Sequence, residues 1–196
     1  LESNTIVEIL TRPKALNIGD VKYPRNIFSM WTNAELAVIG IVPVTIDNTN
    51  FKNQEYYINT NQSFAYDTET GVATATYGTA TAKAIADTLW TAQNETDGLG
   101  TEGEVATRGL KYNHKEVINQ QAAGALAPTD WMIIRAADGG TAVPSSITTK
   151  RAAVRTKANA MQVQIDGAAD VDALAALYEY NDATPPVRPL GELPTV

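Results

Sequence analysis

Several residues of this sequence are of types that bind ligands or catalyse reactions in other proteins. The most recognisable pattern among them is glycine-rich. Gly98-Leu99-Gly100-Thr101-Glu102-Gly103 matches the GxGxxG pattern of dinucleotide-binding loops. That pattern binds a pyrophosphate where it directly follows a buried strand and opens a helix. Here the preceding residues predict an amphipathic helix, and the carboxylates of Glu102 and Glu104 would repel a pyrophosphate. We therefore interpret residues 98–103 as a flexible loop.

His114 is the only histidine in the chain. It precedes Val117 and Ile118 by three and four residues, which places it near the apolar face of a predicted helix. General acid–base catalysis needs an oriented carboxylate beside the imidazole, but Glu116 points away from that face. We interpret His114 as a partly buried or surface side chain without a catalytic role.

Three aspartates, Asp166, Asp170 and Asp172, flank a predicted turn between two helices. A calcium loop places oxygen ligands at alternate positions around a glycine, and only Asp170 and Asp172 have that spacing. Asp170 is better explained as the N-cap of the following helix. The chain has no cysteine, which excludes thiolate catalysis and zinc–thiolate sites. We therefore predict no catalytic, cofactor-binding or metal-binding residue, and we expect that the protein is not an enzyme.

Basic residues gather in one predicted helix. Lys150, Arg151, Arg155 and Lys157 lie within residues 139–165, which contain no acid, although the whole chain carries a net charge of −7. That net charge argues against binding nucleic acid through its phosphates. The group is either a solvated helix face or a contact for an acidic surface. Residues 1–109 of a neighbouring copy, with 7 bases and 13 acids, would provide such a surface.

The first half of the sequence predicts short strands, a small helix and a β-hairpin. We expect strands within residues 1–22, and a helix over 34–39 capped by Thr32 or Asn33, with Glu35 at the capping-box spacing from Thr32. An extended segment at 41–46 precedes a hairpin whose strands, 55–66 and 72–77, are joined by a turn at 67–71. Apolar residues at helical spacing predict a further helix from about 81 to 93. Phe64, Tyr66, Val72 and Tyr77 are the expected buried or interface side chains of the hairpin.

The second half predicts helices at 110–126, 130–137, 145–166 and 170–178. Thr129 is expected to cap the second of these, and Trp131 to anchor it. Apolar stripes are expected at Leu110, Val117, Ile118, Ala122 and Leu126, and at Ile147, Val154, Ala158, Met161 and Ile165. The predicted class is α+β, with an N-terminal α+β region (1–95), a glycine-rich hinge (96–109), an array of three or four helices (110–182) and an extended proline-rich tail (183–196).

A longer motif in the helical half resembles a known family. Leu126-Ala127-Pro128-Thr129-Asp130-Trp131, then Arg135, then Lys150-Arg151-Ala152-Ala153-Val154-Arg155, is similar to the C-terminal motif of tail-fibre assembly proteins of tailed bacteriophages, and to a related domain of phage tail and fibre proteins. That family has Leu-Leu-Ala-x-Thr-Asp-Trp, followed by Tyr-Arg-x-x-Leu-Arg. Lys150 departs from the aromatic residue, and Val154 replaces the leucine. Residues 20–45 also look similar to openings of phage tail proteins.

This resemblance implies a structural virion component of a phage tail, such as a fibre, adaptor or baseplate-associated protein. The alternative is a tail-fibre assembly chaperone that is absent from the mature virion. The expected partners are other tail proteins and further copies of the chain, without nucleic acid, membrane or cofactor. The expected location is the virion, after synthesis in the host bacterial cytoplasm. The expected interaction residues are Trp131, Arg135, Arg151 and Arg155 of the motif, with Tyr57, Tyr66 and Tyr77 of the hairpin region.

No apolar run approaches the roughly 18 residues of a membrane span. Two further functions are weaker alternatives. A host-receptor binder would rest on the tyrosines alone, because aromatic side chains are common at interfaces. A glycan hydrolase would need paired carboxylates on a concave scaffold, which no segment offers.

Overall fold

The computed structural model describes residues 5–196, and its contacts divide the chain into two compact units, Leu1–Thr81 and Ala82–Val196. Strands and helices occur in both, which confirms the α+β class. The division falls between Thr81 and Ala82, whereas the sequence predicted a hinge at 96–109. The difference arises because Ala84, Ile85 and Asp87 accept hydrogen bonds from the N–H groups of residues 109–111. The segment before the first long helix therefore belongs with the helical unit.

The first unit opens with a small hairpin and two short helices. Its elements are β1 (Leu16–Ile18), β2 (Val21–Tyr23), α1 (Ile27–Met30) and α2 (Asn33–Val38). β1 and β2 pair antiparallel around Gly19, whose φ of 56° suits the turn. The predicted capping box of α2 is confirmed, because the Glu35 carboxylate accepts from the Thr32 backbone N–H at 2.8 Å and the Glu35 N–H donates to the Thr32 hydroxyl at 3.3 Å.

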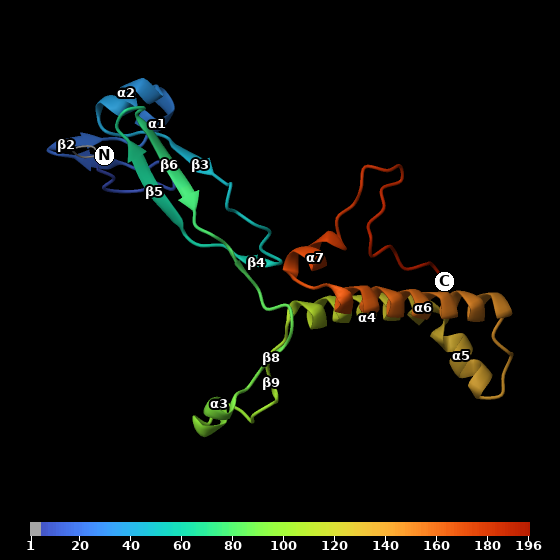
Figure 1. Cartoon of the computed structure of the whole chain (residues 1–196). Coiled ribbons are helices and arrows are strands. Elements are labelled where there is room, and N and C mark those ends of the chain that lie inside the picture. Colours follow the sequence, from blue (N-terminus) through green and yellow to red (C-terminus); the bar gives the residue numbers. More distant parts are fainter. Residues whose placement is uncertain (1–4) are drawn as a thin grey trace. The chain divides into compact units, whose positions relative to one another are not determined.

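A three-stranded sheet follows, formed by β3 (Val44–Asp47), β5 (Gln62–Asp67) and β6 (Val72–Tyr77) in the order β3-β6-β5 (Figure 1). β5 and β6 form the predicted antiparallel hairpin, with its turn at 68–71, and β3 runs parallel to β6. Ala73 and Ala75 of the central strand are buried, whereas Phe64 and Val72 stay largely exposed. The three-stranded sheet does not bury these two side chains, so an interface role for Phe64 and Val72 stays a prediction.

The prediction of a helix over residues 81–93 is wrong. The structure has the short strands β7 (Thr81–Ala82) and β8 (Thr88–Leu89), then α3 (Ala92–Thr96) and β9 (Val105–Thr107), which pairs with β8. The carbonyls of Ala84 and Ile85 accept from the N–H groups of Leu110 and Lys111. In a helix over 81–93 these carbonyls would instead accept from N–H groups four residues farther along. The helix α3 begins only after Thr91, which forms its N-cap and a capping box with Asn94.

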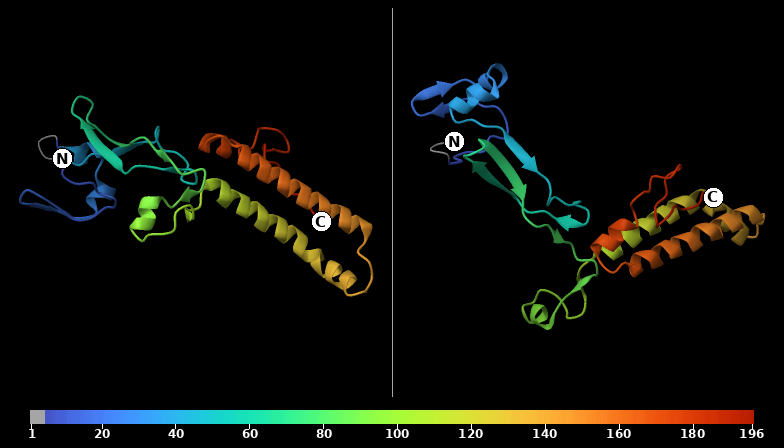
Figure 2. Two further views of the ribbon diagram at one scale, coloured as in Figure 1. Left: turned by 60° about the horizontal axis from the view of Figure 1, so that its bottom comes forward. Right: turned by 45° about the horizontal axis from the view of Figure 1, so that its top comes forward.

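The second unit is built on two long antiparallel helices. Its helices are α4 (Leu110–Leu126), the 3₁₀ turn η1 (Ala127–Thr129), α5 (Asp130–Ala137), α6 (Ser145–Gly167) and α7 (Val171–Ala176). α4 and α6 lie side by side along their length (Figure 2). The buried residues include most of the predicted stripes: Leu110, Ile118, Ala122, Val154, Ala158, Met161 and Ile165. Val117 is exposed and His114 is buried instead, because the buried edge of α4 follows every fourth residue from Leu110.

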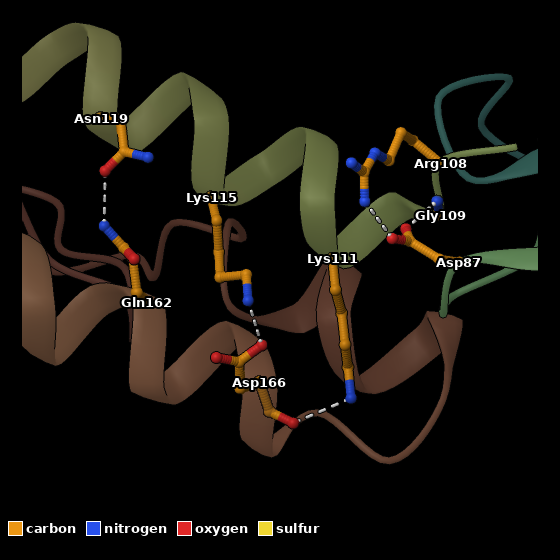
Figure 3. Close-up of polar contacts among 8 residues, drawn as sticks. All are labelled: Asp87, Arg108, Gly109, Lys111, Lys115, Asn119, Gln162 and Asp166. Carbon is orange, nitrogen blue, oxygen red and sulfur yellow. Dashed lines mark hydrogen bonds and ion pairs between the residues drawn. The ribbon is translucent and has the colours of Figure 1, made fainter. Parts of the chain in front are cut away.

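Polar side chains of α4 and α6 contact each other across the helix pair (Figure 3). Lys115 Nζ lies 2.8 Å from an Asp166 carboxylate oxygen, and Lys111 Nζ donates to the Asp166 carbonyl at 2.8 Å. Farther along, the Gln162 amide donates to the Asn119 side chain at 2.7 Å. These contacts fix the register of α4 against α6.

The proline-rich C-terminal segment lies on its own helical unit. Leu190 is fully buried, and its N–H donates to the Leu177 carbonyl at 3.0 Å. Lys157 Nζ donates to the Leu190 carbonyl at 2.8 Å. The segment contains no helix or strand, and Leu190 is its one residue in the core of the unit. Over the described residues 5–196, no helix has the length and apolar character needed to cross a membrane.

Candidate interaction surfaces

The polar cluster around Arg151 joins three segments of the helical unit. Arg151 projects from α6, and its side chain is only 6% exposed. Its Nη1 donates to the Leu126 carbonyl at 2.7 Å and to the Thr129 hydroxyl at 2.5 Å, and its Nη2 donates to Asp130 Oδ1 at 2.6 Å. The last carbonyls of a helix lack partners within that helix, and Arg151 supplies one for α4.

This cluster explains the central part of the motif. Thr129, Asp130 and Arg151, which are up to 22 residues apart in sequence, meet at one point. Thr129 occupies the predicted N-cap position of α5, but its side chain makes no cap hydrogen bond: its hydroxyl instead donates to the Leu126 carbonyl at 2.9 Å and accepts from Arg151. The structure thus places Arg151 in the interior, where its contacts hold the α4–α5 turn against α6.

α5 carries the exposed apolar part of the motif. No residue of α5 is buried, and Trp131 and Ile134 are 52% and 62% exposed. Trp131 therefore does not anchor the helix by burial, and its role as an interaction residue stays a prediction. The Arg135 guanidinium lies over the Trp131 ring, 4.8 Å from its centre, so the helix presents a cation and an aromatic side chain together.

The basic group of α6 divides into two kinds of residue. Arg151 and Lys157 make internal contacts, whereas Lys150 and Arg155 are exposed. Arg155 follows Arg151 by one helical turn, and of these two motif arginines only Arg155 is exposed at the surface.

The three predicted tyrosines all lie in the first unit and do not form a continuous patch. Tyr66 and Tyr77 occupy opposite ends of the β5–β6 hairpin, opposite Ala73 and Gln62 respectively. Tyr77 packs against Phe51 with ring centres 5.0 Å apart. Tyr57 lies under the Lys52 ammonium, 4.4 Å from the ring centre. Each tyrosine is half-buried, so its ring contributes to local packing as well as to the surface.

The glycine-rich loop at 98–103 has a structural explanation. Gly98 and Gly103 have φ values of 71° and 81°, and a Cβ on Gly100 would overlap the Trp90 ring. The loop follows α3 rather than a strand, unlike a dinucleotide-binding loop. His114, the other candidate for chemistry, is buried with its ring centre 4.8 Å from that of Tyr178.

Sequence reasoning missed Asp87, which fixes the loop region to α4 (Figure 3). Its Oδ1 accepts from the Gly109 N–H at 2.8 Å, at the N-terminus of α4, and its Oδ2 lies 2.6 Å from Arg108 Nη1. These two hydrogen bonds, with the nearby positive charge of Arg108, hold the Asp87 pKa below its ordinary value. No local pattern signals this contact, because the partners are 21 and 22 residues from Asp87.

A cavity of about 560 Å³ with mixed polar and apolar walls lies in the first unit. It is bounded by residues 6–18, by α2 and by one face of the sheet, and its walls include Ile6, Leu10, Leu16, Leu36, Val44 and Phe64. Its lining is suited to an aliphatic or aromatic group. Within residues 5–196, no three His, Asp or Glu side chains come together as metal ligands.

Comparison with known protein families, with curated proteins and with solved structures finds no match. A relation to phage tail proteins therefore stays a prediction from the sequence, based on the motif at 126–155 and on residues 20–45.

Proposed function

We propose that this chain is a structural component of a bacteriophage tail, such as a fibre, adaptor or baseplate-associated protein. It would act by docking to further copies and to other tail proteins, without a catalytic step. The phage assignment draws on the motif at 126–155. It is supported by the finding that Thr129 and Asp130 of that motif both hydrogen-bond to the buried Arg151, because a shared cluster explains why these positions would occur together.

The observation that carries the docking role is the accessible surface of 13057 Å². Two separate compact domains of 81 and 115 residues would together expose only about 11,000 Å². The excess is about 2,000 Å², even if no surface is buried between the units. That area corresponds to what a subunit covers in two or three standard protein interfaces, at about 800 Å² each.

The exposed surface is also apolar at many points. Large apolar side chains that are more than half exposed occur in both units, including Met30, Val38, Ile46, Leu99 and Ile134. We infer that several modest contacts act together, so that repeated copies add up to a stable assembly.

The proposal is tested by peptide mass spectrometry of phage particles purified from the host strain in which the chain is made. We expect its peptides in the particles at a fixed ratio to other tail proteins. If the chain is abundant in the infected-cell lysate but absent from purified particles, the structural role is wrong. The transient assembly chaperone would then be the better function.

A further inference from the structure

We propose that two surfaces at opposite ends of the second unit bind each other in neighbouring copies of this chain. The first, the acidic lobe, consists of residues 88–107, with β8, α3 and β9. The second, the basic end, consists of residues 127–157, with α5 and the first half of α6. The inference rests on the proposed function, because an assembling subunit needs such a pair of surfaces.

The acidic lobe carries charge of one sign. Residues 88–107 contain no Lys or Arg and four acids, Glu95, Asp97, Glu102 and Glu104, all exposed. Three large apolar side chains, Leu89, Leu99 and Val105, are exposed among them, and Leu99 is 60% exposed. The lobe therefore presents apolar area within a negative surface.

The basic end has the opposite charge. Residues 127–157 contain five bases and two acids, and one of the acids, Asp130, is already bonded to the buried Arg151. Lys150 and Arg155 are exposed, and Arg135 lies over the exposed Trp131 ring. The exposed side chains of Trp131, Ile133 and Ile134 supply the apolar area. Charge complementarity of this kind steers association and selects the partner.

The two surfaces cannot meet within one copy. The lobe is attached at the first residue of α4, where the Leu110 N–H donates to the Ala84 carbonyl, and α5 follows the last residue of α4. Figure 1 shows them at opposite ends of the α4–α6 pair. The 17 residues of α4 span about 25 Å. The contact is therefore head-to-tail between copies, which closes into a ring or continues as a helical array.

The exposed area is consistent with this arrangement. In a head-to-tail array each copy takes part in two contacts, once through its lobe and once through its basic end. Standard interfaces bury about 800 Å² on each partner, so each copy would cover about 1,600 Å². This area lies within the excess of about 2,000 Å² of the two units taken together.

The test is a charge-exchange experiment on the full chain, with sedimentation velocity as the measurement. The lobe variant Glu102→Lys/Glu104→Lys and the basic-end variant Lys150→Glu/Arg155→Glu change only exposed side chains. We expect each to weaken self-association about tenfold or more in low salt. The variant with all four changes, and an equimolar mixture of the two double variants, should regain association, because opposite charges face each other again.

An apolar pair of variants completes the design. Ile134→Asp should weaken association, whereas Val163→Asp, at a similarly exposed position of α6 outside both surfaces, should not. The inference is wrong if the double variants assemble like the wild type, if the four-fold variant fails to recover, or if the wild type stays monomeric. If the wild type and the charge variants assemble equally well, the contact between the acidic lobe and the basic end is refuted. The proposed structural role is not refuted by that result, because it is tested separately on purified particles.

Discussion

The guanidinium of Arg151 donates to the carboxylate of Asp130 across 21 residues of sequence, with an Nη2–Oδ1 distance of 2.6 Å. The arginine is buried, whereas Asp130 reaches solvent. The same guanidinium bonds a helix carbonyl and a hydroxyl, so a single side chain fixes the turn between α4 and α5. The turn determines where α5 lies, and α5 carries Trp131 and Ile134 of the proposed interface.

Arg151→Met is expected to destabilise the helical unit by about 2–4 kcal/mol, because it leaves the Leu126 carbonyl and the Thr129 hydroxyl without their charged donor. Denaturant unfolding followed by circular dichroism measures this change. Arg155→Met, one turn along and exposed, is the matched control and should change stability by less than about 0.5 kcal/mol. Equal effects of the two variants would contradict the structural role of Arg151.

Gly100→Ala is expected to destabilise the acidic lobe by about 1–3 kcal/mol, because the added Cβ overlaps the Trp90 ring. Trp90 would move, so its fluorescence should change along with the midpoint of unfolding. Gly124→Ala has open space around the new methyl group within α4, and should stabilise the helix by up to about 1 kcal/mol. A neutral Gly100→Ala variant would show that the lobe packs differently.

Leu190→Ala is expected to cost about 2–4 kcal/mol, because Leu190 is fully buried in the helical unit. Limited proteolysis should then cut the C-terminal segment faster than in the wild type. Val187→Ala, in the same segment and 54% exposed, should leave both stability and cleavage nearly unchanged. Rapid cleavage of the wild-type segment would instead mean that it does not pack on the unit.

Asp87→Asn tests the contact that fixes the loop region to α4. The Asp87 pKa is lowered in the folded state, first by the Gly109 N–H and then by Arg108. Its stabilising effect is therefore present above its ordinary pKa of 3.8 and is lost as the pH falls through the lowered value. The free energy of unfolding of the variant should be lower than that of the wild type at pH 7, and the gap should close towards pH 3. A gap that does not depend on pH would contradict this role for the Asp87 charge.

The sequence predicted the helical half well but the segment before it poorly. The apolar spacing of α6, with Val154, Ala158, Met161 and Ile165, is a periodic signal that tertiary contacts reinforce. Residues 81–93 have helical spacing too, yet hydrogen bonds to the start of α4 override it. The interior place of Arg151 could not be predicted, because an arginine on a helix is normally solvated and its three acceptors lie in a distant turn.

The most direct test of the docking role is the mass of the purified chain in solution, measured by light scattering over a range of concentrations. We expect a ring of defined mass or a growing series of oligomers, each a whole multiple of 21.0 kDa, that dissociates on dilution or in high salt. A chain that stays at 21.0 kDa at every concentration would contradict self-assembly through its exposed surfaces.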